Sequence, residues 1–396
     1  MALGYGSTTN ENTYSFHKSP SPFTSSPSPT LRESIVIILK SSWINYFLIF
    51  VPLGYISHIF QWSDNWVFVL NFLAILPLSK LYEFATVDIS LRVGQSIGCL
   101  LNATFGNAVE LIISIIALTQ GEIRVVQASI LGAIISNLLF VTGICFVVGG
   151  TFYKQQVFNQ TTSQTTSSLM TLACIGLVVP AAFTISVNDN LNTVGGQIIK
   201  ELVDLSHGTA IVLLLIYILY LYFQLKTHAN LYHMEEEEEE AQLSLSVLLS
   251  LFVAVTVVVA FLSEYLVGSI EGIVQSSGLS KTFIGMVLLP IIGNAAEFTT
   301  SINAAARNKM DFAIRIASGS SMQIALFITP ILVLFGWTIG QDFTLHFQLF
   351  ETVVFFISVL ITNYLILDGK SNWLEGAMLL ATYAIIALSF FHYPTK

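Results

Sequence analysis

The sequence predicts an all-α polytopic membrane protein with eleven transmembrane helices: one N-terminal helix followed by two inverted-topology repeats of five helices. Three observations lead to this fold class. The composition is apolar, eleven apolar runs are long enough to cross a bilayer, and one glutamate-bearing motif occurs twice in matching contexts. The chain is 54% hydrophobic and only 10% charged, with a mean hydropathy of +0.75. Soluble domains carry about 25% charged residues, so a soluble fold is excluded.

The eleven apolar runs justify the helix count, because each can cross a hydrocarbon core of about 30 Å. With the N-terminus in the cytoplasm, eleven of the fifteen Lys and Arg residues fall on the cytoplasmic side, as the positive-inside rule requires. The C-terminus is then on the opposite side. The runs cover residues 42–61, 66–84, 97–118, 125–149, 168–187, 208–225, 243–268, 278–305, 311–338, 345–366 and 373–392.

These runs divide the chain into five segments. The first is expected to be a disordered cytoplasmic tail, since its residues are rich in Ser, Pro, Thr and Asn. The others are a first transmembrane helix, an N-terminal repeat, an acidic cytoplasmic linker and a C-terminal repeat. The five segments are 1–34, 35–65, 66–226, 227–242 and 243–396.

Charge and cysteine content exclude several function classes. The net charge is −9, and six of the negative charges form one run in the linker, so no basic patch suggests nucleic acid. Cys99, Cys145 and Cys174 are far apart in apolar surroundings, which predicts core-filling residues and neither a metal site nor a disulfide framework.

The repeated motif places a carboxylate inside two predicted spans. Residues 106–110 read GNAVE and residues 293–297 read GNAAE, and both open an apolar run. A carboxylate at mid-bilayer costs roughly 2.5–3.5 kcal/mol on insertion scales. Two such residues in matching contexts, Glu110 and Glu297, therefore predict a functional site.

A shift of 187 residues aligns the two copies without a gap. It pairs Gly106 with Gly293, Asn107 with Asn294, and also Gly132 with Gly319. The copies begin in the third and eighth spans, so they enter the membrane from opposite faces. This is the inverted-topology repeat of many secondary transporters, whose substrate site lies near the midplane.

The residues around the two glutamates predict a site for a hard cation. Gly106 and Gly293 weaken their helices one turn before each glutamate, which leaves backbone carbonyls free to bind a cation. Every other candidate ligand also presents oxygen; these are Asn107, Asn294, Ser136 and Gln323, with Ser320 and Ser321 one turn earlier. Oxygen ligands favour Ca²⁺, with Mn²⁺ as an alternative. Each amide or hydroxyl taken alone also fits a hydrogen bond between helices.

Electrostatics predict an exchange cycle at this site. Bound Ca²⁺ neutralises two glutamates, and without it two poorly solvated carboxylates repel each other and favour uptake of protons. An empty, doubly ionised site is penalised, so the sequence favours cation/proton antiport without a resident cofactor. Mn²⁺/H⁺ exchange, Na⁺-coupled transport and a passive cation channel are the alternatives. An enzyme is disfavoured because no Ser/His or His/His pair accompanies the glutamates.

Four segments resemble the Ca²⁺/H⁺ exchanger family, especially the vacuolar exchangers of yeasts. They read LLNATFGNAVELIISIIAL, VQASILGAIISNLL, GLSKTFIGMVLLPIIGNAAE and NYLILDGKSNWLEG. The resemblance implies the cation/Ca²⁺ exchanger fold in the vacuolar membrane, with Ca²⁺ and H⁺ as substrates; a homo-oligomer stays open. It also implies that Glu110 and Glu297 carry Ca²⁺ and protons, with Asn107, Asn294, Ser136 and Gln323 around them.

The resemblance also assigns a role to the acidic run and marks two departures. Glu235, Glu236, Glu237, Glu238, Glu239 and Glu240 look like the family's acidic segment, which is associated with cytosolic Ca²⁺ sensing; a solvated linker is the alternative. The family usually has His after the second glutamate, where this chain has Phe298. It often has Thr-Glu-Glu-Leu where this chain has Thr86-Val87-Asp88-Ile89.

Overall fold

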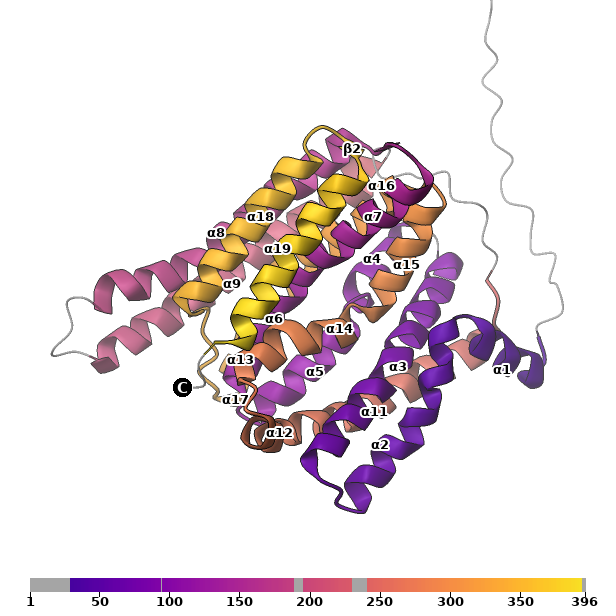
Figure 1. Ribbon diagram of the computed structural model, residues 1–396, viewed down its shortest axis with the longest axis horizontal. Helices are drawn as coiled ribbons and strands as arrows, with labels where there is room; N and C mark the ends of the chain where they lie inside the picture. Colours follow the sequence, from indigo (N-terminus) through magenta and orange to yellow (C-terminus); the bar gives the residue numbers. More distant parts are fainter. Residues whose placement is uncertain (1–28, 94, 189–194, 230–240, 394–396) are drawn as a thin grey trace, which may run out of the picture.

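The computed structural model describes residues 29–93, 95–188, 195–229 and 241–393, and it consists almost entirely of helices (Figure 1). Among these residues, eight helices are long and apolar enough to cross a membrane, or ten if each of two bent pairs is one span. The third predicted span is present as two short helices, α4 (Gln95–Phe105) and α5 (Ala108–Thr119). The all-helical membrane fold is confirmed, and the count of eleven stays a prediction.

The N-terminal part is the helix pair α1 (Leu31–Lys40) and α2 (Phe50–Ile59), joined by the short helix η1 (Trp43–Ile49). The chain bends by 106° between α1 and the helices that follow it. Helix α1 begins inside the expected tail 1–34, because the Thr30 side chain and Glu33 form a capping box that starts a helix there. The helical chain therefore begins earlier than the composition suggested.

The N-terminal half continues through α3 (Asp64–Val93), α4 and α5. The next long helix has three parts, α6 (Ile123–Ile135), the π-helical turn η2 (Ser136–Val141) and α7 (Thr142–Phe152). Helices α8 (Gln160–Asn188) and α9 (Gly195–Tyr222), with the π turn η3 (Phe223–Thr227), complete this half.

The C-terminal half begins with α11 (Leu245–Gly268) and α12 (Ile270–Ser277). The broken helix that follows comprises α13 (Lys281–Phe283), η4 (Ile284–Leu288), α14 (Leu289–Gly293) and α15 (Ala295–Ala306). Then come α16 (Met310–Gln323), the π turn η5 (Ile324–Ile328), α17 (Thr329–Ile339), α18 (Leu349–Ile366) and α19 (Trp373–Phe391). Strand β1 (Gln156–Val157) pairs antiparallel with β2 (Lys370–Ser371) and ties the halves together at one end.

The helix bounds follow the 187-residue shift. Adding 187 to the first and last residue numbers of α5 gives those of α15, and the same holds for α7 and α17. The hydrogen bond from Thr142 Oγ1 to the Asn137 carbonyl (3.0 Å) recurs from Thr329 Oγ1 to the Ile324 carbonyl (2.7 Å), so both copies widen the helix at the same place. π turns are frequent at functional sites. These matches support the repeat inferred from the sequence.

The two halves interlock around a shared core. Helix α3 of the first half packs against α11 of the second, and α7 packs against α19 and α15 (Figure 1). Cys145 and Cys174 are buried and unpaired, as core-filling residues would be, and the side chain of Cys99 lies outside the described part. Interlocking brings the start of α5 to the second half, where Glu110 meets Gly293 of α14 and Asn107 bonds to Ser320 and Gln323 of α16.

Candidate cation site

Both glutamates lie in the first turn of a helix that starts at a break. Helix α4 ends at Phe105 and α5 begins at Ala108, so Gly106 and Asn107 form the first break. Helix α14 ends at Gly293 and α15 begins at Ala295, with a 59° bend between the two pieces. A helix N-terminus stabilises negative charge, so each carboxylate is placed where the helix dipole favours its ionised form.

The hydroxyl of Ser320 joins the two halves at the centre of the site. Ser320 Oγ, on α16, lies 2.6 Å from Asn107 Oδ1 and 2.7 Å from Glu297 Oε1. The Asn107 amide also donates to Gln323 Oε1 at 2.8 Å. Direct hydrogen bonds thus link four of the oxygen-bearing residues noted in the sequence. Ser320, Gln323 and Glu297 lie on α15 and α16 of the second half, and Asn107 lies at the helix break of the first half.

A second amide cluster lies beside this group. Asn137 Nδ2 donates to Ser320 Oγ at 3.1 Å and lies 3.4 Å from Asn294 Oδ1, while Asn294 Nδ2 donates to the Ala133 carbonyl at 3.2 Å. Sequence reasoning missed Asn137, because the repeat pairs it with an apolar residue. Its position inside a span, next to Ser136, was the available signal. The π turn at Ser136–Val141 places it toward the second half.

Glu110 lies against the glycine at the other helix break. A Cβ built on Gly293 would lie 2.6 Å from Glu110 Oε1, so only glycine leaves room for this carboxylate. Both carboxylate oxygens of Glu110 are buried without a hydrogen-bond partner, and so is Oε2 of Glu297. Glu110 borders a cavity of about 20 Å³ together with Ser129 and Gly293, which is room for about one water-sized particle.

Glu297 faces a different and much larger space. A cavity of about 510 Å³ is lined by Glu297, Ser320 and Gln323 at its inner end. It is also lined by Ser41, Gln224 and Arg315, which lie near the helix ends on the side that the topology assigns to the cytoplasm. We call this cavity the vestibule. Glu297 is 9% exposed, so it is almost buried although it borders the vestibule.

Two other positions noted in the sequence lie outside this hydrogen-bonded group. Ser136 is buried in the π turn beside Tyr383, and among the described hydrogen bonds none joins it to Ser320 or Asn107. Phe298 stacks on Phe140 with ring centroids 5.6 Å apart, and Phe140 lies 5.1 Å from the Tyr383 ring. Aromatic packing therefore occupies the position where the resembling family has His. The run Glu235 to Glu240 lies outside the described residues.

Gly132 and Gly319, which the 187-residue shift pairs, have different surroundings. A Cβ on Gly132 would collide with the backbone of Met286, so Gly132 allows two helices to pack closely. A Cβ on Gly319 would meet nothing within 4 Å. Gly132 is thus a packing glycine, whereas Gly319 borders the vestibule.

The fold and this oxygen-lined, two-carboxylate arrangement define a polytopic membrane exchanger as the class of protein. The chain belongs to the sodium/calcium exchanger protein family, whose model matches residues 64–226 and 247–392.

Individual relatives agree with this family. The chain is 47% identical over 361 residues to the vacuolar calcium ion transporter of Schizosaccharomyces pombe, covering 90% of this chain and 86% of the relative. It is 43% identical over 363 residues to the Ca²⁺/H⁺ antiporter of Aphanothece halophytica, covering 88% and 95%. The solved structure of the Ca²⁺/H⁺ antiporter protein YfkE has a TM-score of 0.74 and 35% identity, covering 91% of this chain and all of that one.

Proposed function

We propose that the protein is a secondary antiporter that moves Ca²⁺ from the cytosol into the vacuole lumen in exchange for H⁺. The observation that carries this proposal is the set of three buried carboxylate oxygens without a partner, two on Glu110 and one on Glu297. Leaving a buried charged group unpaired is costly. A cation or protons at these oxygens would remove that cost, so the site needs one or the other at every stage.

The donor set favours Ca²⁺ as the cation. Glu110, Glu297, Asn107 and Gln323 supply carboxylate and amide oxygens, and loosened backbone at Gly106 and Gly293 can supply carbonyls. Ca²⁺ accepts 6–8 oxygens in variable geometry, which suits a site assembled from several helices. Mn²⁺ is the second candidate, because it also accepts carboxylate and carbonyl oxygens.

The hydrogen count at Ser320 supports protons as the counter-substrate. A hydroxyl has one hydrogen and two acceptor positions. Ser320 Oγ receives a hydrogen from Asn137 and lies within hydrogen-bond distance of two further oxygens, Asn107 Oδ1 and Glu297 Oε1. It can donate to only one of them. All three contacts are satisfied together when Ser320 donates to Asn107 and a protonated Glu297 donates to Ser320.

The unequal cavities support alternating access. Glu297 borders the vestibule of about 510 Å³, whereas Glu110 borders a separate cavity of about 20 Å³. Glu297 therefore faces the large space on the side assigned to the cytoplasm, whereas Glu110 faces a space for about one water-sized particle. A channel needs a continuous path, so these separate cavities argue against the passive channel. In this proposal the N-terminus is cytoplasmic, the C-terminus luminal, and residues 66–226 and 243–396 form the two inverted halves.

Uptake into acid-loaded vesicles tests the proposal. Purified protein in vesicles with an acidic interior is expected to take up Ca²⁺ and to stop when a protonophore collapses the pH gradient. Competition by Mn²⁺ would add that ion as a substrate, and dependence on a Na⁺ gradient would replace protons as the coupling ion. Ca²⁺ flux that runs equally with and without the pH gradient would indicate a channel and overturn the proposal.

A further inference from the structure

An ion pair that the exchange site does not use lies on the wall of the vestibule. Lys80 and Glu83 are one turn apart on α3, so they share a helix face, and their side chains form a salt bridge. They are only 16% and 19% exposed. Both line the vestibule that ends at Glu297. Charged residues inside a membrane span are costly and usually functional.

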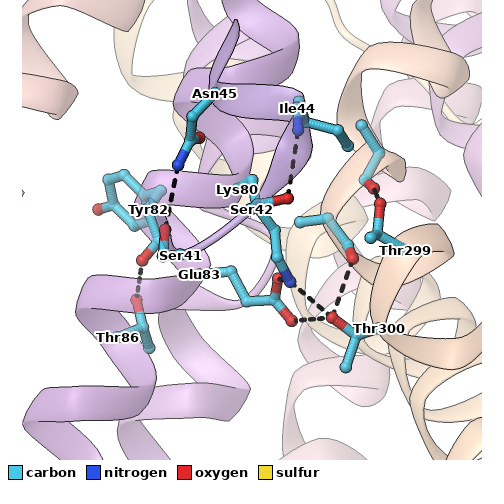
Figure 2. Close-up of polar contacts among 12 residues, drawn as sticks. Ser41, Ser42, Ile44, Asn45, Lys80, Tyr82, Glu83, Thr86, Thr299 and Thr300 are labelled. Carbon is cyan, nitrogen blue, oxygen red and sulfur yellow. Dashed lines mark hydrogen bonds and ion pairs between the residues drawn. The ribbon is translucent and has the colours of Figure 1, made fainter. Parts of the chain in front are cut away.

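Thr300 connects this pair to the helix that carries Glu297. Thr300 Oγ1 lies 2.7 Å from Lys80 Nζ and 2.8 Å from Glu83 Oε1, and Figure 2 shows Lys80 and Glu83 of α3 converging on this hydroxyl. Thr300 is one turn after Glu297 on α15, so both side chains lie on one face of that helix.

We propose that Glu83 and Thr300 form an entry site for the transported divalent cation, and that the Lys80 ammonium occupies this site while no cation is present. The proposal rests on the exchange function proposed above and adds a second binding position on the route to Glu297. A divalent cation entering the vestibule displaces the single charge of Lys80 from Glu83. Glu83 and Thr300 then supply oxygens, and water in the vestibule completes the coordination.

Two features suit a transient site. Lys80 and Glu83 both line the vestibule, so an entering cation reaches the Glu83 carboxylate directly. Next along the route is the Oε2 atom of Glu297, which is buried, has no hydrogen-bond partner and belongs to a residue that lines the same cavity. A cation held at Thr300 is one helical turn from this atom. A cation in the vestibule thus passes from a weak site at Glu83 and Thr300 to a stronger one at Glu297.

A purely structural link between α3 and α15 is the competing interpretation, and two substitutions separate it from an entry site. Lys80→Met keeps the apolar stem but removes the competing ammonium, whereas Glu83→Gln removes the carboxylate. An entry site predicts opposite effects on the KM for Ca²⁺ added at the vestibule side. A structural link predicts effects in the same direction, because either substitution breaks the same pair.

The experiment measures initial Ca²⁺ uptake against Ca²⁺ concentration in acid-loaded vesicles. We expect Lys80→Met to lower the KM by about two- to fivefold, because the ammonium no longer competes with the cation for Glu83. Glu83→Gln should raise the KM by a similar factor, and the double variant should resemble Glu83→Gln. Lys281→Met is the matched control, because it removes a comparable Lys pair with Glu122 and Glu271 on the opposite side.

The outcomes are distinguishable from a failure of the exchange function. If the unmodified protein shows no proton-driven uptake, the exchange proposal itself fails. If it transports but both variants shift the KM in the same direction, or neither shifts it, the entry site is overturned. Should Glu83→Gln not fold, Thr300→Val replaces it: a raised KM supports the entry site and an unchanged KM overturns it.

Discussion

Gly293 and Glu110 come from opposite halves of the chain, and the glycine lies directly against the carboxylate. A side-chain carbon at Gly293 would be 2.6 Å from Glu110 Oε1, closer than carbon and oxygen atoms can pack. The break between α14 and α15 thus leaves the space in which the other half places its acid. The predictions below start from this relationship.

Gly293→Ala is expected to reduce Ca²⁺ uptake at least about tenfold, because the added methyl group displaces Glu110 and overpacking costs about 1–3 kcal/mol. Gly208→Ala on α9 is the control, since its added carbon meets nothing within 4 Å. The measurement is initial uptake rate for variants of equal monodispersity. Uptake by Gly293→Ala equal to that of the control would mean that the glycine does not set the position of Glu110.

Ser320→Ala is expected to weaken Ca²⁺ binding by about tenfold, because it removes the hydroxyl that bridges Glu297 and Asn107, and a hydrogen bond to a charged group is worth about 1.5–3 kcal/mol. Ser321→Ala provides the neighbouring control, since Ser321 Oγ bonds to the Ala317 carbonyl of its own helix at 2.9 Å. Titration calorimetry with Ca²⁺ compares them. Equal affinities in the two variants would remove Ser320 from the site.

His346 lies in the loop between α17 and α18, and its ring is expected to make the folded protein less stable in acid. Burial and the Arg124 charge lower the pKa of His346 from its ordinary value of 6.5, and Glu351 opposes them in part. The folded state therefore favours the neutral ring. As the pH falls below about 6.5, the unfolded chain binds this proton more readily, so stability is lost down to the lowered pKa.

His346→Gln, which cannot ionise, should therefore show a smaller fall in Tm between neutral and acidic buffer than the unmodified protein. Thermal unfolding in detergent at a series of pH values measures this difference. Parallel curves for both proteins would show that His346 does not contribute to the acid response.

The fourth prediction concerns the acidic run Glu235 to Glu240. It rests on the sequence of the run and on the contacts of the residues that follow it. Gln242 donates its backbone N–H to Asp88 Oδ1 at 2.6 Å, and Arg92 donates to the Leu243 carbonyl, so the end of the linker is attached to α3. Cation binding to the acidic run would thus change the forces on α3, which lines the vestibule.

Replacement of all six glutamates by glutamine should leave transport active but change how the rate depends on cytosolic Ca²⁺. The measurement is initial uptake rate against Ca²⁺ concentration for both proteins. Superimposable curves, in maximum and in steepness, would favour a solvated linker.

Sequence periodicity and the repeat predicted the helical membrane fold and singled out Glu110, Glu297, Asn107 and Asn294 as candidate site residues. The repeat could do so because each pair occupies one position in two related helices. The hydrogen bonds around Ser320 agree with the choice of Gln323 as a neighbour.

The remaining features depend on contacts that no periodic pattern encodes. Asn137 reaches Ser320 through a π turn, and the turn changes which side of the helix each residue faces. Thr300 meets Lys80 and Glu83 across a separation of more than 200 residues. Such contacts follow from how the halves interlock, so the vestibule pair could not be inferred from either helix alone.

The central claim is that Glu110 and Glu297 together bind the transported cation and the protons exchanged for it. Proton-driven Ca²⁺ uptake by Glu110→Gln and by Glu297→Gln tests it most directly, because glutamine has nearly the same shape but neither titrates nor balances the cation charge. We predict no uptake above that of protein-free vesicles for either variant, with both proteins folded and monodisperse. Appreciable proton-driven uptake by either variant would contradict the claim.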